Sequence, residues 1–146
     1  MLLDPRGPRF AAAVTTVVLA VALVTGSGWL VLAQAVVFAL TAAHPRTGPY
    51  GLLFRALVAP RLAPPAELEP AAPVRFAQLV GLAFATAGAI GWLAGVPLLG
   101  LVATAAALAA AFLNAAFRLC LGCEAYLAIR RLTGRPLAAH TPAARR

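Results

Sequence analysis

The residues whose types and spacing could do chemistry lie in one stretch near the C-terminal end, residues 118–131. This stretch holds both cysteines of the chain, Cys120 and Cys123, and Glu124 follows the second one directly. On a helix the two thiols would lie about one turn apart on one face, where they could form a disulfide, bind a soft metal or accept sulfur. Glu124 could accept a proton from either thiol. Cys120, Cys123 and Glu124 are therefore the candidate catalytic residues.

The order of reactivity depends on where this motif falls on its helix. We expect the motif to close the helix formed by the preceding apolar run, whose negative end disfavours a thiolate. In thioredoxin-like sites the motif opens a helix instead, and the positive end favours the thiolate. On a straight helix Arg118 would also point away from both thiols. Cys120 would lie one turn deeper in the apolar region, so Cys123, nearer to water, is predicted to react first.

Two other interpretations of the cysteines remain open. A complete zinc site needs four ligands, which this chain could supply only through a dimer or through His44 reaching over. We therefore expect no metal and no cofactor. The other interpretation is that both cysteines are inert and pack as small apolar residues.

The composition predicts an integral membrane protein. Apolar residues make up 62% of the chain, against about 45–50% in soluble domains. Residues 10–43 and 76–117 carry no charge, and each run is too long for one helical crossing of a bilayer core about 30 Å thick. Glycine-containing turns near residues 26–28 and 95–97 divide each run into a hairpin. The prediction is an all-α, four-helix integral membrane bundle in a single domain, residues 1–146, with spans at about 10–25, 29–43, 76–94 and 97–117.

The segment between the hairpins is too rich in proline and arginine to cross. Residues 49–59 have apolar side chains at helical spacing and begin with a proline, which predicts a short interfacial helix in a cytoplasmic loop. Residues 63–73 are proline-rich and predict a stiff extended linker. Residues 118–146 form the cytoplasmic helix end and tail.

The distribution of arginine predicts the orientation. All twelve basic residues are arginines, and the net charge is +8. They flank the apolar runs and avoid both hairpin turns, which is typical of positive-inside topology and not of nucleic-acid binding. We expect a multi-pass cell-membrane protein in contact with the lipid bilayer, with both termini cytoplasmic and no nucleic-acid partner.

Two further patterns concern the packing of the spans. Residues 4–10 recur loosely as residues 69–76, each ahead of a hairpin, which indicates an internal repeat or a coincidence of composition. Small residues recur at helical spacing in residues 77–95 and predict close helix packing, either within the bundle or in a homodimer. Gln34, Gln78 and Asn114 are the strongest polar residues at membrane depth and should face inward. No carboxylate or histidine lies within a span, which argues against a proton-coupled transporter.

Several of these motifs together resemble one protein family. They are Asp4-Pro5-Arg6, Gly48-Pro49-Tyr50-Gly51 with Phe54-Arg55, Arg75-Phe76-Ala77, and Asn114-Ala115-Ala116-Phe117 leading into Cys120-Leu121-Gly122-Cys123-Glu124 with Tyr126. The chain is similar to domain-of-unknown-function family 4395 over nearly its whole length. That resemblance implies a small integral membrane protein without an established activity, and neighbours of the thioredoxin-like and sulfurtransferase kinds.

Two functions follow as hypotheses. The first is a membrane-bound dithiol/disulfide or sulfur-relay protein that uses Cys120 and Cys123 at the cytoplasmic interface, with a soluble thioredoxin-like or sulfurtransferase partner. The second is a non-enzymatic membrane scaffold or subunit whose cysteines are inert.

Overall fold

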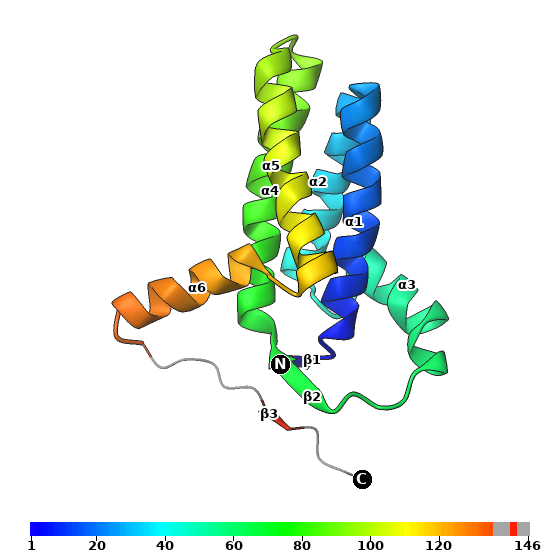
Figure 1. Ribbon diagram of the computed structural model, residues 1–146, viewed down its shortest axis with the longest axis vertical. Helices are drawn as coiled ribbons and strands as arrows, with labels where there is room; N and C mark the ends of the chain where they lie inside the picture. The colour runs from blue at the N-terminus through cyan, green and yellow to red at the C-terminus, as the bar shows by residue number, and fades with distance from the viewer. Residues whose placement is uncertain (136–140, 143–146) are drawn as a thin grey trace.

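The computed structural model describes residues 1–135 and 141–142, and α-helices dominate this part of the chain (Figure 1). The helices are α1 (Arg6–Thr25), α2 (Gly28–Ala43), α3 (Pro49–Leu57), α4 (Ala71–Leu93), α5 (Pro97–Phe117) and α6 (Leu121–Leu132), with a short 3-10 turn η1 (Ala59–Arg61). The helical fold class is confirmed. The expectation that the last span continues as one helix beyond residue 117 is wrong, because α5 ends at Phe117 and a separate helix follows. The rest of the predicted tail lies partly outside the described residues.

Three short strands accompany the helices. They are β1 (Leu2–Leu3), β2 (Glu67–Pro70) and β3 (Thr141–Pro142), and they form a small antiparallel sheet in the order β1-β2-β3. Residues 63–73, expected to be a stiff extended linker, are paired as a strand over residues 67–70 and helical from Ala71 onward. Because β2 lies between the other two strands, it ties the start of the chain to the start of α4.

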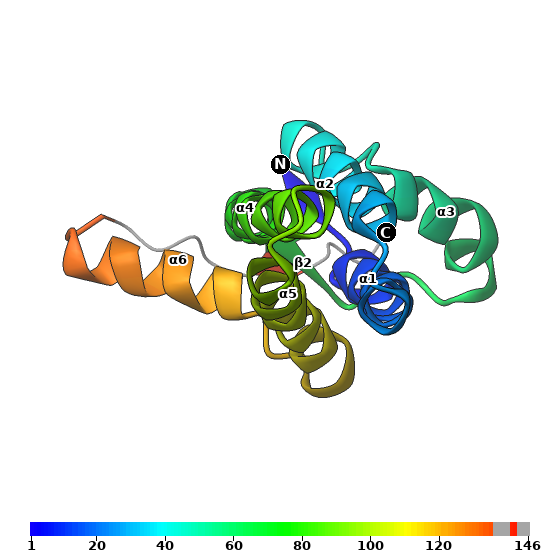
Figure 2. The same ribbon diagram turned by 90° about the horizontal axis from the view of Figure 1, so that it is seen from above.

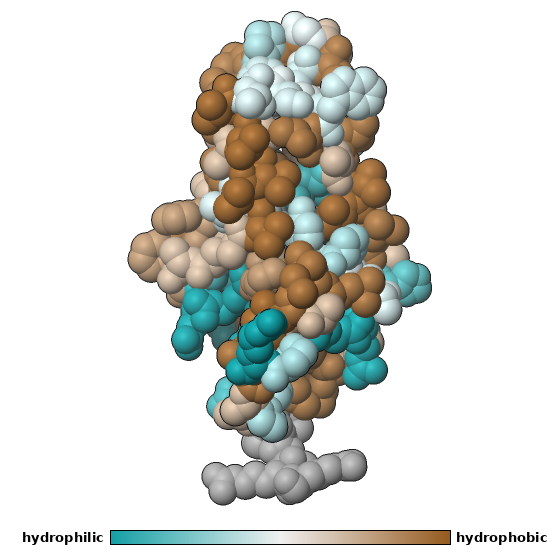
Figure 3. Space-filling view, turned by 90° about the vertical axis from the view of Figure 1, so that its right-hand side faces the viewer, coloured by the Kyte–Doolittle hydropathy of each residue, from teal (hydrophilic) through white to brown (hydrophobic). Residues whose placement is uncertain are grey.

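Three helices, α1, α4 and α5, are long and apolar enough to cross a membrane, whereas α2 is shorter at 16 residues. Both α1 and α4 begin a few residues before the expected spans. A proline stands at the third position of each helix, Pro8 and Pro73, where the missing N–H would have had no partner within the helix. Gly26 and Gly95, both at positive φ, end α1 and follow α4, and each starts a hairpin turn. In Figure 3 apolar side chains cover the long helices, and hydrophilic ones gather around the lower end.

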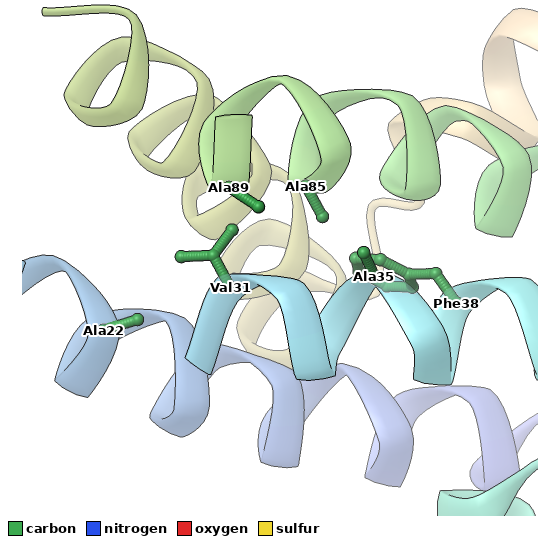
Figure 4. Packing of buried hydrophobic residues seen from close by; sticks show 6 residues of the cluster. All are labelled: Ala22, Val31, Ala35, Phe38, Ala85 and Ala89. Atoms are coloured by element: carbon green, nitrogen blue, oxygen red, sulfur yellow. The ribbon is translucent and has the colours of Figure 1, made fainter. Parts of the chain in front are cut away.

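The centre of the bundle is built from small side chains on α2 and α4. A buried cluster joins these two helices to α1 (Figure 4); its members are Ala22 of α1, Val31, Ala35 and Phe38 of α2, and Ala85 and Ala89 of α4. A Cβ added at Gly88 would lie 2.8 Å from Thr104 Oγ1, and one added at Gly91 would collide with the backbone of Gly100. The small-residue stripe of α4 thus receives α2 on one side and α5 on the other, as close helix packing in lipid requires.

The order of elements occurs twice. Each half runs from a short strand through two long helices to a short one, as β1-α1-α2-α3 and then β2-α4-α5-α6. Contacts between helices follow the same rule, since α1 packs on α5 as α4 packs on α2, and α3 packs on α1 as α6 packs on α4. Seen from above, α3 and α6 project to opposite sides of the long helices (Figure 2). The repetition indicated by residues 4–10 and 69–76 therefore extends through both halves.

Aromatic contacts show which residues of the two halves are equivalent. Phe10 of α1 packs on Phe54 of α3 with ring centroids 5.8 Å apart, and Phe76 of α4 packs on Tyr126 of α6 at 5.7 Å. Phe54 and Tyr126 hold the same position, the sixth, in their helices. Counting from the helix starts, Gly48 and Gly51 are then the counterparts of Cys120 and Cys123.

Candidate functional site

The site begins at a break in the backbone between α5 and α6. Arg118 has φ 59°, and within the described residues it is the only residue other than glycine with positive φ. Its backbone N–H and that of Leu119 both donate to the carbonyl of Leu113, which ends α5. A left-handed residue at this position is how many helices stop, although glycine is the usual residue. The expectation that the cysteines close the preceding helix is wrong, because the chain turns before reaching them.

The cysteine pair instead opens α6. Cys120 is the N-cap, and its Sγ accepts a hydrogen bond from the backbone N–H of Cys123 at 3.3 Å. The two residues are joined by a disulfide, with their Cα atoms 5.2 Å apart. A thiolate formed at Cys120 would therefore lie at the positive end of the α6 dipole. The premise that the pair lies at the negative end of a helix is therefore wrong, whereas the order in which the two thiols react stays a prediction.

Close packing of α6 on α4 fixes the position of the pair. A Cβ added at Gly122, between the cysteines, would lie 2.6 Å from the Cα of Ala77. Because Gly122 has no side chain, the backbone of α4 at Ala77 can lie directly against α6. Phe76 and Tyr126 continue the contact, and the Arg130 guanidinium lies 5.6 Å from the Tyr126 ring centroid.

Both cysteines line a polar cavity of ≈ 560 Å³ on the strand side of the bundle. Its charged lining residues come from α1, β2, α6 and the α5–α6 joint; they are Arg6, Arg9, Glu67, Glu69, Arg118 and Glu124. Arg118 lines the same cavity as the disulfide, and the straight helix for which it was predicted to point away is interrupted at this residue. Glu124 lines the same cavity, which brings together the three predicted site residues Cys120, Cys123 and Glu124.

Two arginines of α1 are held in place around this cavity. Arg6 pairs with Asp4 at 2.8 Å and donates through Nη1 to the carbonyl of Ala63. Partial burial raises the pKa of Asp4, but its hydrogen bonds from Arg6 outweigh this and leave the pKa below its ordinary value. Arg9 donates through Nη2 to the carbonyl of Ala115 near the end of α5, at 3.2 Å. Sequence spacing gave no signal for the bonds to Ala63 and Ala115, because each joins residues more than fifty positions apart.

One family is identified by comparison with known proteins. The family described as "Domain of unknown function (DUF4395)" matches residues 3–131, from the first strand to the last turn of α6. The chain belongs to the DUF4395 family. No curated protein and no solved structure matches it. The family assignment covers every residue of the polar cavity, but it carries no activity with it.

A second cavity, of ≈ 430 Å³, lies within the DUF4395 bundle itself. It is bounded by α1, α2, α4, α5 and the start of α6, and Cys120 lines it whereas Cys123 does not. Gln34, Gln78 and Asn114, the three polar residues expected to face inward, all line it. The disulfide of this DUF4395 chain therefore stands between a charged cavity and an uncharged one.

Gln34 is fully engaged inside the DUF4395 bundle. It is 1% exposed, its Nε2 donates to Thr15 Oγ1 at 3.2 Å, and its Oε1 accepts from the Tyr50 hydroxyl at 2.8 Å. Burial raises the pKa of Tyr50, which keeps its hydroxyl protonated as a donor. These bonds tie α2 to α1 and to α3.

Loss of the Gln34 amide is expected to weaken this connection. Gln34→Leu should lower the free energy of unfolding by about 1 kcal/mol, since hydrogen bonds between membrane helices are worth roughly 0.6–1.7 kcal/mol. Tyr50→Phe removes only one of the two bonds and should cost less. Thermal unfolding in detergent measures both, and an unchanged midpoint for Gln34→Leu would contradict the expectation.

Metal binding has no support in the described part of this DUF4395 chain. Residues 1–135 and 141–142 contain no group of three or more histidine, cysteine, aspartate or glutamate side chains that could hold an ion. His44 is exposed at the C-terminal end of α2 and does not line either cavity beside the disulfide.

Proposed function

We propose that this chain is a membrane-embedded thiol-disulfide protein whose Cys120–Cys123 pair exchanges electrons with a soluble thioredoxin-like partner. The observation that carries the proposal is the position of the pair. The two cysteines open a helix, are joined as a disulfide and line a cavity rich in charge. Inert structural cysteines are usually buried in apolar surroundings, whereas this pair lies at a helix start beside charged residues.

The helix start supports a direction for the exchange. Thiol-disulfide exchange is faster when the leaving thiol is the better stabilised thiolate. Cys120 is that group, because it caps α6 and its Sγ already accepts a backbone N–H. A partner thiolate would therefore attack Cys123 Sγ, and the electron pair of the broken S–S bond would go to Cys120 Sγ.

A second step completes the exchange. The partner's other thiol, as a thiolate, attacks the partner sulfur of the mixed disulfide, and Cys123 leaves as a thiolate. The partner becomes oxidised to a disulfide, and two electrons and two protons pass to the Cys120–Cys123 pair. Glu124, on the rim of the same cavity, is placed to receive and release a proton during these steps.

The charged cavity supports docking of a soluble partner. Arg6, Arg9 and Arg118 line the same cavity as the sulfur pair, together with three glutamates. Mixed charges of this kind select and orient a partner more than they add affinity. A partner with a complementary pattern around an exposed thiol fits this surface.

Membrane placement is part of the proposal. The three long apolar helices, α1, α4 and α5, support spanning, and α2 returns beside α1 in the first hairpin. Exposed apolar residues at the far end of the bundle, Val24, Trp29 and Leu98, support contact with lipid there. We propose four crossings with the strands, α3 and α6 on the cytoplasmic side.

Reporter tags test this topology. Tags inserted at Ser27 and Val96, in the two hairpin turns, should lie outside, and a tag at Met1 should lie inside. Labelling of intact cells with a membrane-impermeant reagent would report each position. Cytoplasmic tags at the turns would overturn the placement.

The redox proposal is tested by trapping the pair in native membranes. Samples are quenched in acid and alkylated with a 5-kDa maleimide, so that each free thiol adds a resolvable mass. We expect two added masses after treatment with a reduced thioredoxin-type protein without denaturant, and none before it. The Cys120→Ser/Cys123→Ser double variant, which should add no mass at any stage, is the control.

Two other results would each overturn the redox proposal. A disulfide that the reduced thioredoxin-type protein opens only after this chain is denatured would favour a scaffold with an inert pair. A sulfur relay would leave a persulfide, visible in intact-mass spectra as one extra sulfur atom that a reductant removes.

A further inference from the structure

We propose that the uncharged cavity within the bundle binds a membrane-soluble quinone, which reoxidises the Cys120–Cys123 pair. This inference rests on the proposed thiol-disulfide function and names the electron acceptor for it. A pair that takes electrons from a soluble partner needs an acceptor in order to return to the disulfide. The cavity lies where a lipid-soluble acceptor would be, on the side of the pair away from the charged surface.

The lining of the cavity selects a neutral and mostly apolar molecule. None of the residues that line it carries a charge, so anionic carriers such as nucleotides have no counter-charge there. Phe38, Phe84, Val37 and Val80 supply apolar walls, with alanines of α1 and α5 between them. Its volume, ≈ 430 Å³, lies within the roughly 300–1,000 Å³ usual for small-molecule and cofactor sites.

Two amides are available to bind such a molecule. Gln34 already has its bonds to Thr15 and Tyr50. In contrast, the side chains of Gln78 and Asn114 have no hydrogen-bond partner among residues 1–135 and 141–142. Both line this cavity, at the boundary that it shares with the charged one. Amide N–H groups are donors suited to carbonyl oxygens. A quinone offers two such oxygens on a flat apolar ring, which matches this lining.

The two cysteines differ in the cavities that they line. Cys120 lines both cavities, and Cys123 lines only the charged one. A soluble partner meets both cysteines in the charged cavity, whereas a ligand in the bundle meets only Cys120. The thiolate favoured at the start of α6 is also the one on the quinone side.

The reaction balances without another reagent. The Cys120 thiolate adds to the quinone ring, and the Cys123 thiolate then attacks Cys120 Sγ. The S–S bond forms, the bond from sulfur to the ring breaks, and its electron pair stays on the ring. The dithiol loses two electrons and two protons, and the quinone gains both to become the quinol.

The test follows the reaction of the reduced, purified protein with decylubiquinone in anaerobic detergent solution. This probe has a fully substituted ring, which limits simple thiol arylation. We expect disulfide formation by maleimide trapping, with one quinol formed per disulfide and a rate that saturates with quinone concentration. Gln78→Leu and Asn114→Leu should each raise the quinone concentration needed for half-maximal rate by about tenfold, the loss of one good hydrogen bond of ~1.4 kcal/mol.

A matched control and a binding measurement keep the result interpretable. Thr86→Val removes a polar group from an exposed position of α4 that does not line the cavity, and it should leave the rate unchanged. The Cys120→Ser/Cys123→Ser variant should still bind decylubiquinone in equilibrium titrations, and Gln78→Leu on that background should bind it more weakly. The site would be overturned if Gln78→Leu on the Cys120→Ser/Cys123→Ser background bound decylubiquinone as tightly as the Cys120→Ser/Cys123→Ser variant and the Thr86→Val variant do.

Failure of this inference can be told apart from failure of the proposed function. A pair that a thioredoxin-type protein reduces, but that decylubiquinone oxidises no faster than it oxidises free dithiothreitol, would overturn the quinone site alone. A pair that no thiol protein reduces in the native state would overturn both.

Discussion

The Cys120→Ser variant is expected to hold a persistent mixed disulfide between Cys123 and its partner protein, and the Cys123→Ser variant is expected to hold none. The expectation follows from the start of α6, where Cys120 is the capping residue and faces the bundle interior. Cys123 would attack the oxidised partner and form the bond to it, and Cys120 would be the thiol of this chain that completes the exchange. Without Cys120 only the partner's own second thiol can release the bond, so more of the adduct accumulates.

The measurement is recovery of the trapped adduct from membranes under denaturing, non-reducing conditions. Roughly tenfold more adduct should form on Cys120→Ser than on Cys123→Ser, because only the first keeps the attacked sulfur and loses the resolving one. Reductant should release the partner from both samples. Equal adduct on the two variants, or more on Cys123→Ser, would reverse the assignment.

Alkylation rates give an independent check on the same pair. The single thiol that remains in Cys123→Ser, Cys120, should react faster with iodoacetamide near pH 7, because the helix start favours its thiolate. This is the reverse of the order predicted from sequence alone. A faster reaction of Cys123 would show that exposure outweighs the helix end.

Gly91→Leu is expected to cause the largest loss of stability. The backbones of Gly91 and Gly100 pack so closely that an added Cβ has no space, and the side chain of Trp92 covers Gly100 from the same hairpin. Forcing a leucine between α4 and α5 should cost about 3 kcal/mol or more, the upper range for overpacking. Close helix contact is also what stabilises such a hairpin in lipid.

The change can be followed by thermal unfolding in detergent, with tryptophan fluorescence reporting on Trp92. Ala83→Leu is the matched control, because Ala83 lies on the same helix and is exposed. It should shift the midpoint little. A Gly91→Leu midpoint equal to that of the control would show that the two helices separate without cost.

The hairpins were predictable because their signals are local. Residues 10–43 and 76–117 are uncharged and too long for one crossing, and glycines stand where the turns occur. The break before the cysteines was not predictable in the same way. Arg118 takes a left-handed conformation that sequence rules assign to glycine or asparagine, so nothing in the residue type marked the end of α5.

The candidate site was predictable only in part for a related reason. Cys120, Cys123 and Glu124 are close in sequence, so their meeting follows from spacing alone. Arg9 and Glu69 reach the same cavity from α1 and β2, which depends on how distant elements pack. The two cavities on either side of the disulfide likewise arise from packing and leave no pattern along the chain.

The repetition of the fold supplies a sulfur-free counterpart of the site within one molecule. At the start of α3, Gly48 takes the capping position that Cys120 takes in α6, and α3 still forms and packs on α1 through Phe54. A short helix of this kind therefore folds against its long neighbour without a thiol at its start. The helix start alone does not explain why cysteines stand in the second half, and their presence there points to chemistry carried by only one of two equivalent positions.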